Sequence, residues 1–373
     1  MSDGDDRARD PVDWGAARRV GRLVAGRVPI AESYLGTSLV ADFRDVTREA
    51  EEIVTDYTGL RADGGARAEV LDRAGWVDVN VESMQRLLAP LVERIGKRLE
   101  RRGVMGGVAR AATAAEMGAL LGFLSQRVLG QYDLLVPDPV GAAPTDAAGS
   151  GDVVYFVGPN ILTIEKRFAF RPRDFRLWIA IHEVTHRAQF SGVTWLRDYY
   201  LSLVERALTL VEPDPWVVVR ALTNAADELR HGRNPFDQGG IIGLVATPEQ
   251  RGVLAQVQAL MSLLEGHGNV VMSELGRRHV VGEERMARVL AARRRRGGAT
   301  GHLHRVLGFE AKMRQYEVGE QFVRGVIREA GPTGLDAAWR GPEWLPTVEE
   351  LAAPTAWLAR ADARVLRGAA GGE

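Results

Sequence analysis

The sequence contains no cysteine among its 373 residues, and this absence removes several kinds of site at once. Disulfide bridges, thiolate metal sites, iron–sulfur clusters and cysteine nucleophiles all require that side chain. Any metal ion must therefore be bound by histidine, aspartate or glutamate.

Long uncharged apolar runs are also missing. The most apolar helix-like window, 117–129, is interrupted by Gln126 and Arg127 and is shorter than the roughly 18–20 residues that a membrane span requires. The acidic first residues lack the apolar stretch of a secretory signal. We therefore expect no membrane partner and a cytoplasmic location.

An excess of charge of either sign is lacking as well. The 48 Lys and Arg residues against 49 Asp and Glu residues give a formal net charge of −1, so no global field attracts nucleic acid or an anionic membrane. The run Arg293–Arg296 is a weak hint of phosphate contact. Because such a run between helices is usually a solvated loop, we expect an exposed loop there and no nucleic-acid partner.

Helical periodicity dominates what is present, and it predicts a mainly α fold with long helices. The capping-box pattern Thr247-Pro248-Glu249-Gln250 predicts a helix start at that point, and another long helix is expected from about 303 to 329. Further helical stretches are expected near 62–75, 79–102 and 108–131.

One run is typical of a strand. Residues 152–157 are β-branched or aromatic and end at Gly158-Pro159. Such a strand could lie along a substrate peptide at a sheet edge, or it could be buried within a small sheet.

Changes in composition predict the domain organisation. The segment 136–151 is rich in Pro, Gly, Ala and Asp, which favours a loop. We predict a disordered tail at 1–12, an N-terminal helical subdomain at 13–135, the loop at 136–151, a metal-binding catalytic subdomain at 152–351, and a C-terminal helix with a frayed tail at 352–373.

The chemistry is indicated by His182-Glu183-Val184-Thr185-His186, in a stretch that no Pro or Gly interrupts. Asp174 is a suitable N-cap and Gly192 a suitable end for a helix around the motif. Residues at i and i+4 project from one face of a helix, so both imidazoles can reach one ion at about 2.0–2.1 Å. Glu183 is rotated by about 100° from His182, where it suits a general base that activates water.

Two histidines need a third ligand to bind a catalytic zinc ion. Position 192, where a His-x5-His extension would place a third histidine, is glycine, and the inverted His-x-x-Glu-His order is absent. The strongest candidate is Glu265, at the end of an apolar run where a solvated charge would be out of place. His267 is the rival, and another carboxylate is a further alternative. Asn269, four residues after Glu265, is a candidate for a supporting hydrogen bond.

A hydrolytic reaction also needs a donor for the oxyanion that forms. Tyr316 is the candidate, with Arg314 as an alternative, although a tyrosine at helical spacing is more often part of a core.

Together these residues resemble a known family. The segments 172–178 and 181–187, with Leu263–His267 and Arg314–Tyr316, resemble the actinobacterial zincin-like metalloproteases, a family of hydrolases with one branch associated with the biosynthesis of a deazaflavin coenzyme. The resemblance covers about Trp14 to Leu351. It implies a mainly α, α+β zincin-like fold with a small sheet next to the active-site helix, Zn²⁺ bound by His182 and His186, and Glu183 as the catalytic residue.

The sequence thus predicts a zinc-dependent hydrolase, a gluzincin-type metallopeptidase acting on a peptide or amide substrate. Many gluzincins carry aspartate four residues after the glutamate ligand, and this chain has Asn269 instead. A zincin-fold binding or regulatory protein with weak or no activity is therefore the alternative. The sequence identifies neither the substrate nor the oligomeric state.

Overall fold

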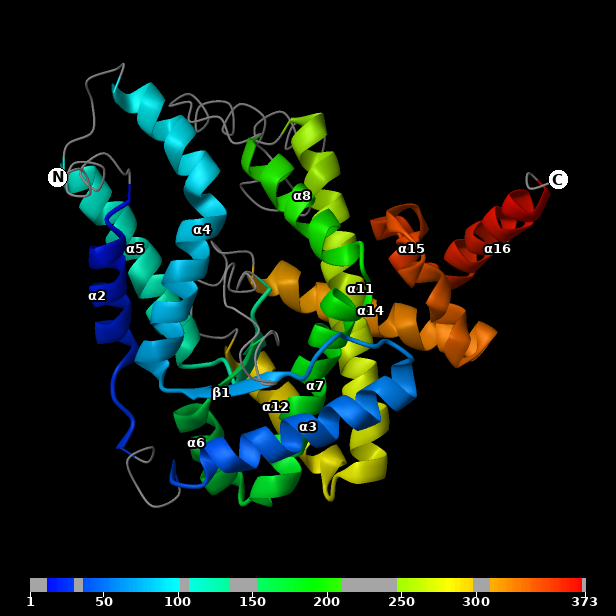
Figure 1. Ribbon diagram of the computed structural model, residues 1–373, viewed down its shortest axis with the longest axis horizontal. Coiled ribbons are helices and arrows are strands. Elements are labelled where there is room, and N and C mark those ends of the chain that lie inside the picture. The colour runs from blue at the N-terminus through cyan, green and yellow to red at the C-terminus, as the bar shows by residue number, and fades with distance from the viewer. Residues whose placement is uncertain are drawn as a thin grey trace. The chain divides into compact units, whose positions relative to one another are not determined.

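The computed structural model describes residues 12–29, 36–100, 107–134, 153–209, 247–297 and 309–370 (Figure 1). The predicted loop at 136–151 lies outside these residues, and so does the predicted tail at 1–12 apart from Val12, which is buried. The chain divides into two compact units. The first comprises Met1–Ala188 with Leu275–Val281, and the second comprises Gln189–Glu274 with Gly282–Glu373.

The first unit contains a small mixed sheet. Its strands are β1 (Arg67–Leu71), β2 (Gly130–Tyr132) and β3 (Val153–Val157), in the order β1-β3-β2. β1 runs parallel to β3 and β2 runs antiparallel to it. The strand predicted at 152–157 is therefore confirmed, and because it is central and fully buried it offers no edge to a substrate.

Long helices surround this sheet, as the sequence predicted. In the first unit they are α2 (Trp14–Ala25), α3 (Leu39–Thr58), α4 (Arg73–Glu100), α5 (Gly107–Ser125), α6 (Gly158–Phe168) and most of α7 (Pro172–Gly192). α3 lies along the sheet (Figure 1), where Phe43 stacks on Phe156 of β3 with ring centroids 4.0 Å apart. The prediction of a mainly α fold with a small sheet is confirmed.

Two of the predicted helical stretches were partly wrong. The stretch 62–75 contains strand β1, and the stretch 108–131 ends as a helix at Ser125 and continues into strand β2. Pairing with β3 explains both differences, because backbone hydrogen bonding to a buried strand outweighs a weak local helical pattern. The stretch 79–102 lies mostly within α4.

Helices α2 and α5 pack with their backbones in contact. A Cβ atom added to Gly118 would lie 2.3 Å from the carbonyl oxygen of Ala17, and one added to Gly122 would lie 2.5 Å from that of Gly21. Because any side chain would force the helices apart, glycine is required at both positions of α5.

A buried ion network fixes the beginning of α7. Arg176 donates to both carboxylate oxygens of Glu165 on α6, at 2.8 and 2.9 Å, and also to Asp42 on α3. Asp174 lies in the first turn of α7 rather than at the predicted N-cap, and its Oδ1 accepts a hydrogen bond from the backbone N–H of Val281. The beginning of the motif helix is thus held by carboxylates on α6 and α3 and by a backbone hydrogen bond from Val281.

All regular secondary structure in the described residues of the second unit is helical. Its elements are α8 (Leu196–Thr209), most of α11 (Pro248–His279), α12 (Glu283–Gly297), α14 (Phe309–Ala330), two short 3₁₀ helices η3 (Pro332–Trp339) and η4 (Pro342–Trp344), α15 (Val348–Leu351) and α16 (Pro354–Ala370). The predicted start of α11 is confirmed. Thr247 and Gln250 exchange the two hydrogen bonds of a capping box, at 2.6 and 3.2 Å.

The predicted loop at Arg293–Arg296 is wrong, because α12 continues as a helix to Gly297. Arginine has a high helix propensity, and no glycine or proline interrupts the helix before that residue. The run of arginines is therefore a polar segment of the helix and does not interrupt it.

Helices α11 and α14 cross at a point next to Glu265. A Cβ atom on Gly266 would lie 2.2 Å from the carbonyl carbon of Gly319, and one on Gly319 would lie 1.9 Å from the carbonyl oxygen of Ser262. This close backbone contact needs glycine on both helices. It fixes the position of α11 relative to α14 one residue after Glu265.

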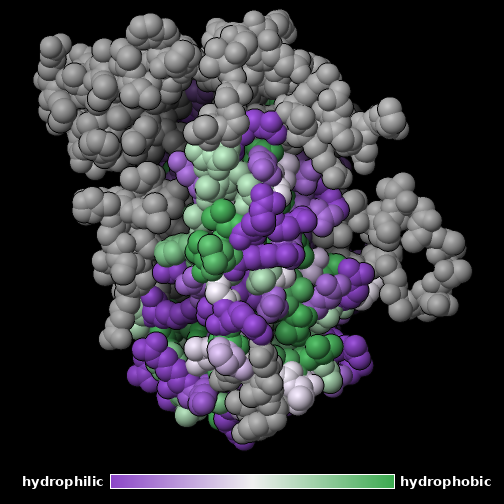
Figure 2. All heavy atoms as spheres, turned by 90° about the vertical axis from the view of Figure 1, so that its left-hand side faces the viewer, coloured by the Kyte–Doolittle hydropathy of each residue, from purple (hydrophilic) through white to green (hydrophobic). Residues whose placement is uncertain are grey.

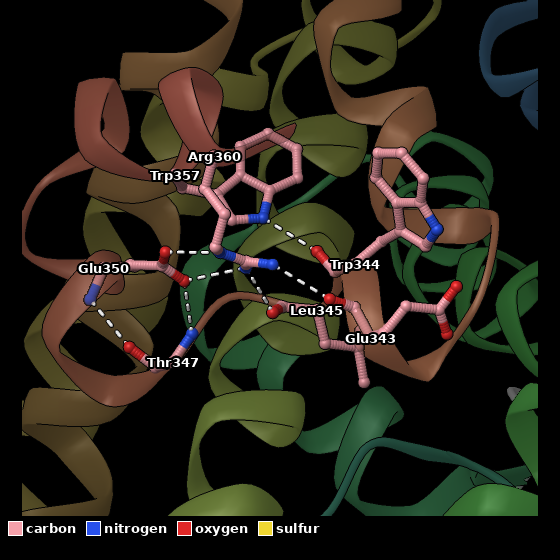
Figure 3. Close-up of polar contacts among 7 residues, drawn as sticks. All are labelled: Glu343, Trp344, Leu345, Thr347, Glu350, Trp357 and Arg360. Atoms are coloured by element: carbon pink, nitrogen blue, oxygen red, sulfur yellow. Dashed lines mark hydrogen bonds and ion pairs between the residues drawn. The ribbon is translucent and has the colours of Figure 1, made fainter. Parts of the chain in front are cut away.

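The C-terminal segment is held by one arginine (Figure 3). Arg360 on α16 donates to both carboxylate oxygens of Glu350 and to the carbonyl oxygens of Glu343 and Leu345. The neighbouring Trp357 is fully buried and donates its indole N–H to the carbonyl oxygen of Trp344. These bonds tie η4, α15 and α16 into the core of the second unit.

On the face seen in Figure 2, hydrophilic and hydrophobic residues alternate in small groups, without a large apolar patch among the residues that are coloured. Exposed large apolar side chains are scattered, as with Leu23 on α2 and Leu254 on α11. Within the described part of the chain, none of the helices has the length and apolarity needed to cross a membrane.

Candidate metal centre

The two motif histidines lie side by side on α7. The helix runs without interruption from Pro172 to Gly192, and the Nε2 atoms of His182 and His186 are 3.2 Å apart. Their ring centroids are 4.6 Å apart and the ring planes are nearly perpendicular, at 82°. The spacing of one helical turn thus brings the two nitrogens together, as expected for residues at i and i+4.

This separation suits a shared metal ion. Two nitrogens at about 2.0–2.1 Å from a tetrahedral zinc ion lie roughly 3.3–3.4 Å apart. The observed 3.2 Å between the two Nε2 atoms is close to that value. The distance between the two nitrogens therefore fits a shared zinc ion.

Glu265 completes a group of three potential ligands. One carboxylate oxygen of Glu265 and one nitrogen from each of His182 and His186 all lie within 4.8 Å of one another. All three side chains are partly buried. Two imidazoles and one carboxylate are the donor set of several catalytic zinc sites, so the residues present fit the ion that the sequence predicted.

His267, the rival ligand, makes a different contact. Its Nδ1 accepts a hydrogen bond of 2.8 Å from the Gln189 amide, which also donates to the carbonyl oxygen of Leu264 at 3.0 Å. Its ring lies 5.2 Å from that of Trp339. Because α11 continues through Gly266 and Gly268, residues 265 and 267 project in different directions, and His267 does not belong to the group of three.

Glu183, the predicted general base, is buried on α7 with 7% of its surface exposed. The backbone of Gly130 on β2 lies directly against its side chain, so the small sheet is next to the motif helix, as predicted.

Arg187 anchors the end of the motif. Its guanidinium donates to Glu51 at 2.7 Å and to the carbonyl oxygens of Asp63 and Gly64 at 2.8 and 3.0 Å. Glu51 in turn accepts a hydrogen bond from the backbone N–H of Ala66. The residue after His186 therefore ties α7 to α3 and to the loop before β1.

Sequence reasoning missed Arg187, Gln189 and Gly130. Their partners are far away along the chain; Arg187 and Glu51, for example, are separated by 136 residues. No local sequence pattern therefore indicates these contacts. The nearest signal in the sequence was that two long polar residues, Arg187 and Gln189, follow the motif on the same helix. Both are buried in the structure, where polar side chains need partners.

Three further residues were predicted to support the site, namely Asn269, Tyr316 and Arg314. Asn269 is buried on α11, four residues after Glu265. Tyr316 and Arg314 belong to α14, but their side chains lie outside the described residues. Their role as oxyanion donors stays a prediction.

Two comparisons connect this chain with known proteins. A family model described as zincin-like metallopeptidase matches residues 12–358. A crystal structure from Chloroflexus aurantiacus, described as that of a candidate hydrolase with a novel fold, is 28% identical with a TM-score of 0.68, and the match covers 94% of this chain and 99% of that one. No curated protein matches the chain.

Proposed function

This chain belongs to the zincin-like metallopeptidase family, and from that premise we propose that it is a zinc-dependent hydrolase of peptide or amide bonds. The observation that carries the proposal is the group formed by His182, His186 and Glu265, whose ligand atoms lie within 4.8 Å of one another. The similar protein from Chloroflexus aurantiacus is itself described as a candidate hydrolase, which supports the same reaction class.

The three residues would bind the ion in a gluzincin-type arrangement, with two imidazole nitrogens from α7 and one carboxylate oxygen from α11. Zinc, when bound, supplies a Lewis acid that polarises a carbonyl group and lowers the pKa of water towards neutrality. Three protein ligands are the number found in catalytic rather than structural sites.

Glu183 would move the proton. Its carboxylate accepts a proton from the attacking water molecule and later gives it to the leaving nitrogen, which is the usual sequence for a general base that then acts as a general acid. It follows His182 directly in the chain, so it reaches the same region without competing for the ion. Its side chain is buried, which limits its contact with bulk water.

A second candidate function rests on Asn269. Where many gluzincins carry aspartate, this buried position holds a neutral amide, which cannot add negative charge beside the ligands. A zincin-fold binding or regulatory protein that retains zinc but turns over little or no substrate would fit that difference.

The two functions are separated by the Glu183→Gln variant. We expect the wild-type chain to bind one zinc ion and to cleave members of a fluorogenic peptide library, and Glu183→Gln to retain zinc while kcat falls by about 10²–10⁴-fold. Metal content is measured by plasma mass spectrometry and hydrolysis by fluorescence. Glu205→Gln, at an exposed position on α8, is the matched control and should leave both quantities unchanged.

Full activity of Glu183→Gln would contradict the general-base role. Zinc binding by the wild-type chain without hydrolysis of any library member would favour the binding protein instead.

A further inference from the structure

Strand β2 passes unusually close to Glu183. A Cβ atom built on Gly130 would lie 2.6 Å from Cγ of Glu183, 2.7 Å from its Oε1 and 2.8 Å from its Cδ. These three atoms are the nearest heavy atoms to that position, and real Cβ atoms essentially never approach other atoms within 3.0 Å. The space that a side chain at position 130 would need is therefore occupied by the carboxyl end of Glu183.

Space, rather than backbone conformation, is the reason for glycine at this position. Gly130 is not among the described glycines with positive φ, so its backbone is one that any residue can adopt. It lies in a regular strand, paired with Phe156 of β3. What distinguishes position 130 is the neighbour that it faces.

Neither backbone can readily yield. The strand is held through its pairing with buried β3 and through the hydrogen bond of 2.8 Å from the N–H of Val157 to the carbonyl oxygen of Leu129. The helix is held one turn beyond Glu183 by the hydrogen bonds of Arg187 to Glu51 and to the loop at Asp63 and Gly64. The movable part of this contact is the carboxylate of Glu183.

We propose that Gly130 is a positioning residue for the general base, and that its lack of a side chain lets the Glu183 carboxylate occupy its place against strand β2. The proposal rests on the proposed function, because it assigns a catalytic consequence to that place. Any side chain at position 130 would displace the carboxylate, because the three atoms nearest to the added Cβ all belong to Glu183. We expect His182, His186 and Glu265 to retain the ion.

The first test is Gly130→Ala in the full-length, zinc-loaded protein. We expect kcat to fall about 100-fold, the cost typical of a catalytic group misplaced by about 1 Å, with KM, zinc content and melting temperature unchanged. Gly252→Ala, where an added Cβ meets no atom within 4 Å, is the matched control and should behave as wild type. A Gly130→Ala variant with kcat within twofold of wild type would overturn the proposal.

A rescue experiment covers the case in which Gly130→Ala folds poorly. Because the three nearest atoms all belong to Glu183, the double variant Gly130→Ala/Glu183→Ala should recover the melting temperature of Glu183→Ala alone. If the double variant stays as unstable as Gly130→Ala, the methyl group clashes with something other than Glu183 and the proposal is wrong.

A crystal structure of Gly130→Ala separates this inference from the proposed function, since it needs no substrate. A displaced Glu183 carboxylate supports the positioning role even if the wild-type protein hydrolyses nothing, in which case the proposed function alone fails. A carboxylate in its original place would overturn the inference, whatever the activity.

Discussion

Two groups of buried or partly buried polar side chains form around helix α7, about two turns apart, with opposite electrostatic characters. At its beginning, the Arg176 guanidinium is surrounded by the carboxylates of Glu165 and Asp42. Further along, His182 and His186 lie with Glu265 in a group in which each member offers an electron pair. The first group is a cation enclosed by anions, whereas the second is a set of donors that suits a cation.

This difference in charge shows that the two groups have different roles in the protein. Burial alone would lower the pKa of Arg176, but its hydrogen bonds to Glu165 and the charges of Glu165 and Asp42 outweigh that effect and raise it. The network therefore keeps its charge and fixes the helix. The donor group offers two imidazole nitrogens and one carboxylate oxygen, a set that a divalent ion would bind.

The largest effect is expected in the donor group. Glu265→Gln removes an anionic ligand, so zinc affinity should fall by more than the 10–100-fold typical for the loss of an outer hydrogen-bond partner. Competition titration with a chromophoric chelator measures this affinity. His267→Gln is the control, because the imidazole bonded to Gln189 lies outside the group of three. Loss of zinc from His267→Gln with retention in Glu265→Gln would reverse the assignment.

The next largest effect is expected in the ion network. Arg176→Met leaves Glu165 buried without its cation, and such a change typically costs about 3–5 kcal/mol of unfolding free energy. Arg173 lies on the same helix as Arg176 and forms an exposed ion pair with Glu49 of α3. Arg173→Met removes this pair and should cost about 0–1 kcal/mol. Urea denaturation followed by circular dichroism gives both values. Equal costs for the two variants would show that burial does not distinguish these pairs.

The smallest effect is expected at Arg360, where a similar arginine network in the second unit is partly exposed (Figure 3). Burial alone would raise the pKa of Glu350, but hydrogen bonds from Arg360 and from the backbone N–H of Thr347 outweigh it and lower the pKa below its ordinary value of 4.5. A carboxylate with a depressed pKa stabilises the fold above its unfolded pKa, and this stabilisation is lost as the pH falls through the folded pKa.

Arg360→Met should therefore cost about 1–2 kcal/mol at neutral pH, and the difference from wild type should shrink as the pH falls below about 4.5. Urea denaturation at a series of pH values measures this difference. Arg328→Met, at an exposed position on α14, is the control and should show little dependence on pH. A difference that grows towards acid pH would contradict the assigned direction of the pKa.

Features set by neighbouring residues were predictable from the sequence. The start of α11 follows from Thr247 and Gln250, which bond to each other three residues apart. The approach of His182 and His186 follows from their spacing of one turn. The strand at Val153–Val157 follows from its β-branched and aromatic composition. Each of these features depends on residues that lie within a few positions of one another in the sequence.

Features set by distant partners were not predictable in this way. Strand β1 exists because β3 pairs with it, although its own sequence suggested a helix. The anchoring of Arg187 depends on Glu51, and the glycine at position 130 depends on Glu183. Nothing in the residues around Arg187 or Gly130 indicates which side chain will lie against them.

The sequence by itself therefore determined which reactive groups this chain can offer: two imidazoles and a carboxylate on one helix, and no thiol anywhere. Only the tertiary structure decided which acidic or imidazole group lies beside the histidine pair, and which strand lies against Glu183. The physical reason is that helical spacing acts within one turn, whereas the meeting of residues 182 and 265 or 130 and 183 depends on how whole elements pack.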